Sequence, residues 1–275
     1  LTGGIYTPAA VTLGMTGALQ QGNFTQNLSF TSVSKGWNLI SNPYASNIDW
    51  TAVTRTNVDN AVYTYRPALS GGTYASYVNG SITNGASQYI ETGSAFFVRA
   101  NAASPTLGWH EADKVTNNPT NSTFRTTAIN NRLSLTLVND SNQNTDEVVV
   151  RFGNDNASDV FDAKYDAVNM AGASHDLYVL DKLQEKYSIY HGSELYNWQI
   201  EKRIVNLGFA NAPIGSYTIS ASILNEFSNG NTVWLKDAYT GTLTEIKANT
   251  SYSFQVTTDA ATHGNARFSL VLNPK

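Results

Sequence analysis

Apolar and polar residues alternate along much of this chain. Leu133, Leu135 and Leu137 are separated by Ser and Thr, and the same alternation recurs in three later stretches. Successive side chains of a β-strand point to opposite faces, so a period of two buries the apolar set and leaves Ser, Thr and Gln in water. The later stretches are residues 217–221, 252–256 and 268–272. The pattern indicates β-strands with one buried face.

Turn residues separate the expected strands. Asn79-Gly80 and Asn84-Gly85 are typical of tight reversals, because Asn and Gly tolerate positive φ. No stretch sustains a helical period, and the best helix candidate, residues 223–227, is one turn long. We therefore predict an all-β fold made of antiparallel β-sandwich-like units of the Ig or jelly-roll kind. Further strands are expected at residues 24–33, 61–65, 73–78, 95–99, 147–152, 177–180, 200–207 and 232–236.

A polar stretch near the middle of the chain predicts a boundary between two such units. Residues 116–122 contain one proline and no apolar residue, which is typical of linkers. We predict an N-terminal β-sandwich over residues 1–118, rich in Trp and Tyr, and a C-terminal β-sandwich over residues 119–275. A chain of 275 residues is long enough for each unit to bury a core.

The composition excludes several classes of function. Charged residues make up 14% of the chain, against roughly 25% in ordinary soluble domains. The 17 Lys and Arg are outnumbered by 21 Asp and Glu, so nucleic acid is not an expected partner. No apolar run approaches the roughly 18 residues of a spanning helix, so no transmembrane segment is expected. The chain has no cysteine, which excludes disulfides and thiolate chemistry.

Motifs of catalysis are missing from the sequence. Ser87 follows a Gly-x pair, but Tyr89 occupies the position where a nucleophile elbow needs its second glycine. His110 and Glu111 begin like a zinc-protease helix, yet Lys114 stands where the second His belongs. Nothing marks a pair of carboxylates as the acid and base of a glycosidase. We predict that the protein is not an enzyme, with a triad assembled across the fold as the alternative.

One loop has the character of a cation site. Residues 154–159 and the acids after them supply closely spaced Asn and Asp oxygens, which calcium prefers as ligands. The spacing of an EF-hand is absent, and Asn and Asp also populate ordinary turns because they bond to their own backbone. Two interpretations stay open, plain turn chemistry and bound calcium, the latter with these ligands: Asp155, Asp159, Asp162 and Asp166.

Aromatic residues gather in the N-terminal half, where charge is low and Asn and Gly are frequent. Sugar rings stack on aromatic faces, so this composition fits a carbohydrate-binding surface. Tyr63 and Tyr65 are two positions apart and share one face of a strand, where a sandwich core also needs aromatic residues. Core packing is the simpler interpretation. The glycan interpretation predicts an exposed row formed by some of these residues: Trp50, Tyr65, Tyr74 and Tyr77.

The segment from Gly36 to Trp50 carries a family resemblance. Its fifteen residues, GWNLISNPYASNIDW, resemble the GWNLIGNPYPSPIDW segment of many large secreted proteins of Bacteroidota. Weaker similarities follow in order, and the end of the chain is similar to the stretch that precedes the C-terminal sorting domain of type IX secretion cargo. These similarities lie at residues 61–65, 93–98, 147–152, 161–167, 214–220, 234–237 and 266–272.

The resemblance implies a location and a role, and it supplies no catalytic residues. It implies a non-catalytic β region of an exported protein, extracellular or at the cell surface. We therefore expect a structural or adhesive module whose partners are surface glycans or other surface or matrix proteins. A surface with little charge and many sheet edges also permits self-association. Within the fifteen-residue segment, Trp37 and Trp50 are expected to close the turn at Pro43 by packing together.

Overall fold

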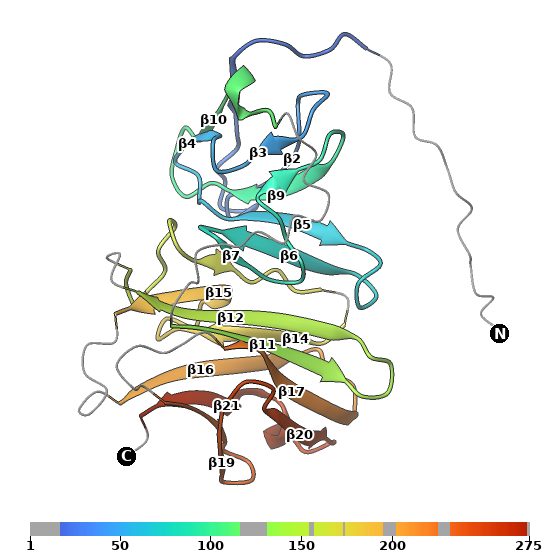
Figure 1. Cartoon of the computed structure of the whole chain (residues 1–275), viewed down its shortest axis with the longest axis vertical. Helices are drawn as coiled ribbons and strands as arrows, with labels where there is room; N and C mark the ends of the chain where they lie inside the picture. Colours follow the sequence, from blue (N-terminus) through green and yellow to red (C-terminus); the bar gives the residue numbers. More distant parts are fainter. Residues whose placement is uncertain are drawn as a thin grey trace, which may run out of the picture.

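The computed structural model describes residues 17–115, 131–153, 157–172, 174–194, 202–224 and 232–273 (Figure 1). Their regular structure is β-strand, apart from two short 3-10 helices at Glu111–Asp113 and Ala260–Thr262. The all-β prediction is therefore confirmed. Residues 223 and 224 of the helix candidate belong to a strand instead, because they continue its pairing with a neighbour. None of the helices in the described residues is long and apolar enough to cross a membrane.

The N-terminal part, residues 17–115, contains three antiparallel sheets. A five-stranded sheet has the order β2 (Trp37–Ser41), β9 (Ala95–Arg99), β5 (Val62–Arg66), β6 (Thr73–Val78) and β7 (Ser81–Ile82). A three-stranded sheet consists of β1 (Phe24–Asn27), β10 (Thr106–Trp109) and β4 (Thr54–Thr56). β3 (Ile48–Asp49) pairs with β8 (Tyr89–Ile90). One core, which includes Ile40, Trp50, Phe96 and Trp109, lies between these sheets.

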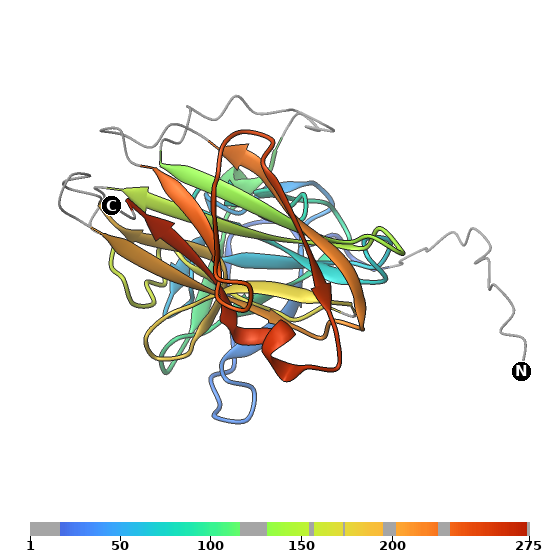
Figure 2. The same ribbon diagram turned by 90° about the horizontal axis from the view of Figure 1, so that it is seen from below.

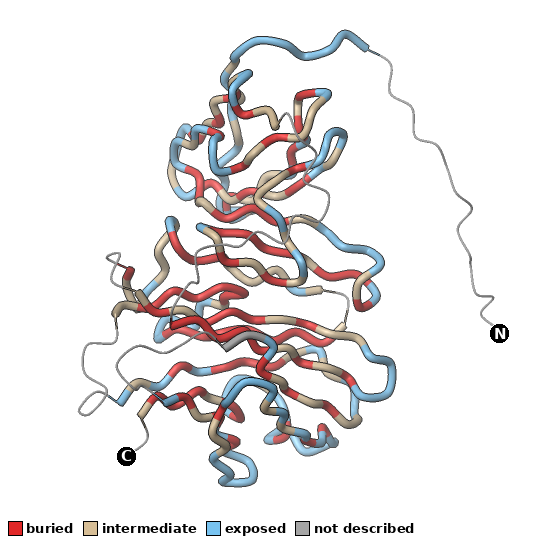
Figure 3. The backbone as a smooth tube through the Cα atoms, in the orientation of Figure 1, coloured by how far each residue is buried: buried red, intermediate tan, exposed pale blue. Residues whose placement is uncertain are grey.

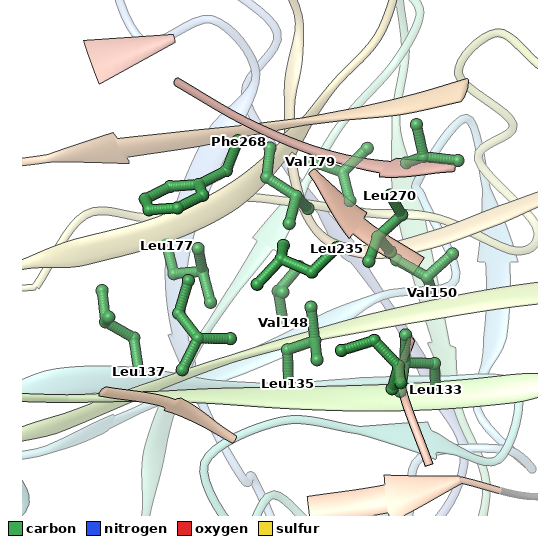
Figure 4. Close-up of a cluster of buried hydrophobic side chains, with 14 of the residues drawn as sticks. Leu133, Leu135, Leu137, Val148, Val150, Leu177, Val179, Leu235, Phe268 and Leu270 are labelled. Carbon is green, nitrogen blue, oxygen red and sulfur yellow. The ribbon is translucent and has the colours of Figure 1, made fainter. Parts of the chain in front are cut away.

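The C-terminal part, residues 131–273, is built on one eleven-stranded sheet. Its strands are β11 (Arg132–Asn139), β12 (Thr145–Gly153), β13 (Ala167–Val168), β14 (Asp176–Leu180), β15 (Lys186–Ser193), β16 (Arg203–Ala210), β17 (Gly215–Leu224), β18 (Val233–Asp237), β19 (Thr242–Glu245), β20 (Ser251–Val256) and β21 (Gly264–Leu272). The sheet curls so that strands far apart in its order enclose one hydrophobic core, where Leu135 lies near Leu235 (Figure 4). This is the sandwich-like arrangement that the alternating pattern predicts.

One strand pair departs from the antiparallel prediction. β12 and β15 run parallel, with Val150 opposite Tyr190. The segment between these two strands contains β13 and β14. It is long enough to carry the chain back to the starting edge, so that β15 runs in the same direction as β12. All other pairs among the described strands are antiparallel.

The two parts are stacked along the long axis of the molecule (Figure 1), and in the view from below the C-terminal strands lie in front of the N-terminal part (Figure 2). Between them lies a third buried cluster, here called the junction core, which joins side chains from both parts. Buried positions, red in Figure 3, occur in the strands on both sides of this junction. The predicted boundary at residues 118 and 119 lies outside the described residues. The junction core contains Ala61, Tyr63, Val78, Val149, Ala167 and Ile189.

The fifteen-residue segment folds differently from the expected loop. Asn42 holds it, because its side-chain amide donates to the backbone oxygens of Ser46 and Ile90 and its Oδ1 accepts from the Tyr44 amide. The two indoles belong to different clusters: Trp37 packs against the junction core, whereas Trp50 lies in the N-terminal core. The expectation that they close the turn together is therefore wrong. They lie on opposite faces of the five-stranded sheet, where Trp37 contacts Tyr63 and Trp50 contacts Phe96.

Candidate functional site

Two of the four predicted ligand-binding aromatic residues are core residues. Trp50 is 1% exposed, and its indole N–H donates to the backbone oxygen of Asn60 at 2.7 Å. The Arg55 guanidinium lies 4.9 Å from the centre of the Trp50 ring and donates to the Trp50 backbone oxygen. Tyr77 is also buried, in the same core. The structure therefore gives Trp50 and Tyr77 a packing role and no exposed face.

The other two residues, Tyr65 and Tyr74, contact each other at the surface. Their ring centres are 5.2 Å apart, and Tyr65 is 48% exposed. The ring of Tyr74 also meets Phe97 edge to face at 5.9 Å. Phe97 pairs with Leu39, which is 60% exposed. The strand register puts all four on one face, and we call them the aromatic strip: Leu39, Phe97, Tyr74 and Tyr65.

Backbone and side-chain packing fix the ring of Tyr65. Gly72 has a φ of +113°, and a Cβ atom there would lie 2.1 Å from the Tyr65 hydroxyl oxygen. The ring therefore lies directly against the glycine backbone, with Tyr74 beside it. Leu39 and Phe97, the latter partly buried against the junction core, were not among the predicted residues of this surface. The signal was present, since Leu39 and Phe97 alternate with core residues in their strands, but only the register brings the strands together.

The predicted calcium loop uses its carboxylates as turn and backbone acceptors. Asp166 is fully buried, with Oδ1 accepting from the His191 amide at 2.7 Å and Oδ2 from the Asp162 amide at 2.8 Å. Burial raises the pKa of Asp166 to about 7. Asp162 in turn accepts from the Lys164 amide. The bond from Lys164 to Asp162 is an Asx turn, whereas Asp166 accepts from amides that are four and 25 positions away in sequence.

Asp159 has a separate set of partners. It accepts from the amide and the hydroxyl of Ser193, both at 3.0 Å, and lies 3.6 Å from the Arg203 guanidinium. Burial by itself raises the pKa of Asp159, but the bonds from Ser193 and the charge of Arg203 outweigh it, and the pKa is lowered. Asp155 lies outside the described residues. Within the described ranges, no three His, Cys, Asp or Glu side chains are grouped to hold a metal ion.

An acidic cluster that the sequence analysis missed lies where the two parts meet. Asn84 lies in the N-terminal part. Its backbone N–H donates to the Glu147 carboxylate at 2.8 Å, and its side-chain amide donates to the Asp146 carboxylate at 3.1 Å. The other oxygen of Asp146 accepts from the Leu177 amide. Burial, and next the charge of Asp176, raise the pKa of Asp146 to about 7. We call Asp146, Glu147 and Asp176 the acidic junction cluster.

The residues considered for catalysis serve local turns. The Ser87 hydroxyl accepts from the Tyr89 amide at 3.0 Å. The His110 amide donates to the Asp113 carboxylate, and Lys114 forms an ion pair with Glu111 at 2.6 Å. Each of these contacts is between residues no more than three apart in sequence, as in ordinary turn capping.

The fold defines a class of all-β protein in which two stacked parts share a buried junction. The chain matches the family described as Domain of unknown function (DUF8693) over residues 4–272, and it belongs to that family. Neither a curated protein nor a solved structure matches the chain. The family match runs through both parts and the junction between them. The family unit is therefore larger than either predicted sandwich.

Proposed function

We propose that this chain is a non-enzymatic structural or adhesive module of a secreted or cell-surface protein of Bacteroidota. Its role is to hold neighbouring segments of that protein at a fixed distance and orientation. The resemblance of residues 36–50 supports an origin in type IX secretion cargo. The observation that carries the proposed role is the junction core, because a module that transmits position must not bend between its parts.

Polar contacts reinforce the junction core at several places. The Ser188 hydroxyl donates to Ser76 at 3.0 Å across the junction. Ser70 both donates to and accepts from the backbone of Thr145, at 2.7 and 2.6 Å. Direct hydrogen bonds between the two parts, added to the apolar core, resist sliding as well as separation. These contacts support a rigid connection between the parts.

Calorimetry of the whole chain tests the proposed rigidity. A shared core predicts one unfolding transition whose calorimetric and van't Hoff enthalpies agree. Ile189→Ala should lower the stability by about 2–5 kcal/mol while keeping one transition, because Ile189 is completely buried in the junction core. Two well-separated transitions in the unaltered chain would contradict the proposal. A panel of glycosides and esters tests the non-enzymatic part, since turnover of any of them would refute it.

The aromatic strip supports a second candidate function, the binding of neutral glycans. Tyr65, which is 48% exposed, and the partly buried Tyr74 present a fixed pair of rings, and aromatic faces bind the apolar faces of sugars. Calorimetric titration with cellohexaose, maltoheptaose and chitohexaose tests it. Tyr239 is the control, because it is equally exposed, at 49%, but lies between β18 and β19. Glycan binding that is lost in Tyr65→Ala and kept in Tyr239→Ala would support this function. If none of the three sugars binds, glycan binding is refuted and the structural role remains as the proposed function.

A further inference from the structure

The outer edge of the five-stranded sheet has open backbone groups. β2 is the end strand and pairs only with β9. The bonds from the Ala100 amide to Gly36 and from the Asn42 amide to Ser94 fix which residues of β2 face β9. Antiparallel pairs alternate between bonded and non-bonded positions. The N–H and C=O groups of Leu39 and Ser41 therefore point away from β9.

The open part of this edge has defined ends. At one end, the Trp37 amide donates to the backbone oxygen of Ser34, so the turn before β2 covers that position. At the other end, Pro43 has no N–H to offer. No hydrogen bond from the described residues reaches the backbone of Leu39 or Ser41. Two residues thus leave two donors and two acceptors open to a partner strand.

Two other sheet edges in the described residues are guarded, whereas this one is not. The edge of β20 is occupied by the Arg267 guanidinium, which donates to the backbone oxygen of Gln255 at 2.8 Å. β7, at the opposite edge of the five-stranded sheet, is only two residues long. β2 has five residues and no charge, and its Leu39 side chain is 60% exposed. Proteins usually protect such edges with charge, proline or shortness.

We propose that β2 pairs antiparallel with β2 of a second copy of this chain, around a two-fold axis at Ile40. In this register Leu39 lies opposite Ser41 of the second copy, and Ser41 lies opposite its Leu39. Each such bonded pair exchanges two hydrogen bonds, so four bonds satisfy the outward N–H and C=O groups of Leu39 and Ser41 in both copies. A two-fold contact is closed, which ends the assembly at a dimer.

The second copy fits this edge better than an unrelated strand for two reasons. The edge is self-complementary, since its two open residues match each other about the axis and neither carries a charge that would repel its own copy. The pairing also brings the exposed Leu39 side chains of both copies onto the same face of a continuous sheet. Because the contact is short, it is smaller than a standard interface, and we expect association in the micromolar range or weaker.

Sedimentation velocity of the purified chain, from micromolar to millimolar concentration, tests this proposal. The unaltered chain should shift from monomer to dimer. Leu39→Pro should remain monomeric at every concentration, because it removes an outward N–H and no bond to β9. Leu39→Lys should have the same effect through charge repulsion. Leu183→Lys is the matched control, since Leu183 is 72% exposed and lies in the turn between β14 and β15 of the C-terminal part.

The chain has no cysteine, so a single Ser41→Cys variant gives a second, positional readout. A short bismaleimide should link two copies through Cys at position 41, and Leu39→Lys in the same chain should prevent the linkage. Far-UV circular dichroism and the melting temperature identify any variant that fails to fold. A monomer at all concentrations, or a dimer that persists in Leu39→Lys, would overturn the proposal. Neither result bears on the rigid-module role, which calorimetry tests separately.

Discussion

Removing one partner of the buried ion pair between Arg267 and Asp237 should be one of the most destabilising single changes in the C-terminal part. The two side chains are 2% and 1% exposed. Nη2 of Arg267 donates to Oδ2 of Asp237 at 3.0 Å, and Nε donates to Oδ1 at 3.1 Å. Asp237 also accepts from the hydroxyl of Tyr252 in β20, at 2.9 Å. Through Tyr252 the pair connects β18 and β21 to β20 at the other end of the sheet, and no backbone ladder joins β20 to either strand.

The geometry sets the size of the expected effect. Asp237→Leu leaves a buried guanidinium without its carboxylate, and a broken buried pair of this kind costs about 3–5 kcal/mol. Arg267→Met should cost a similar amount, because it also removes the donor to the backbone oxygen of Gln255. Burial by itself raises the pKa of Asp237, but the bonds from Arg267 and Tyr252 outweigh it and the pKa is lowered. The carboxylate is therefore charged at neutral pH, as the argument requires.

Urea unfolding followed by circular dichroism measures these changes. The double variant Asp237→Leu with Arg267→Met should be more stable than the sum of the single losses predicts, by about 2 kcal/mol or more, since neither charge is then left alone. The slope of the unfolding free energy against urea should stay constant, which shows that the fold is kept. Single losses below about 1 kcal/mol, or a strictly additive double variant, would refute the reasoning.

Three further predictions concern buried groups. Burial raises the pKa of Asp146 to about 7, whereas an unfolded Asp titrates at about 4. Between these two pH values the folded state binds more protons, so stability should fall by about 4 kcal/mol as pH rises from about 4 to about 7. Asp146→Asn should flatten this dependence in urea titrations at several pH values, and an unchanged slope would contradict the assignment. Gly208→Ala would place a Cβ 1.9 Å from the buried Tyr178 ring, so we expect the free energy of unfolding to fall by about 1–3 kcal/mol. Gly17→Ala is the control and should cause no change, because the space around Gly17 is open. Equal melting temperatures of the two variants would disprove the close contact. Trp50→Phe removes the indole hydrogen bond and leaves a cavity, for an expected loss of about 1–3 kcal/mol in the same assay, and an unchanged midpoint would exclude the packing role.

The residues of the aromatic surface could be predicted from the sequence only in part. Tyr65 and Tyr74 were both in the predicted aromatic set, because composition alone marks this segment as rich in tyrosine. Composition does not separate them from Trp50 and Tyr77, which are buried. The face of each strand that becomes covered depends on which sheet packs against it. That choice is made by contacts between residues far apart in the chain.

The acidic junction cluster illustrates the same limit. Asp146 and Glu147 read as ordinary polar residues at the start of a strand, and Asn84 as part of a turn. Their hydrogen bonds join residues more than 60 positions apart. The carboxylates are buried because the two parts pack together, so the local sequence pattern does not predict their burial.

The sequence by itself determined that this protein is all-β and, in the four clearly alternating strands β11, β17, β20 and β21, which side chains face a core. A strand has only two faces, so alternation of apolar and polar residues is a local signal that needs no knowledge of partners. The tertiary structure decided the parallel pairing of β12 with β15, the separation of Trp37 from Trp50, and the junction core that unites the two parts. These features depend on strand order and on sheet-to-sheet packing, in which distant residues compete for the same buried surface.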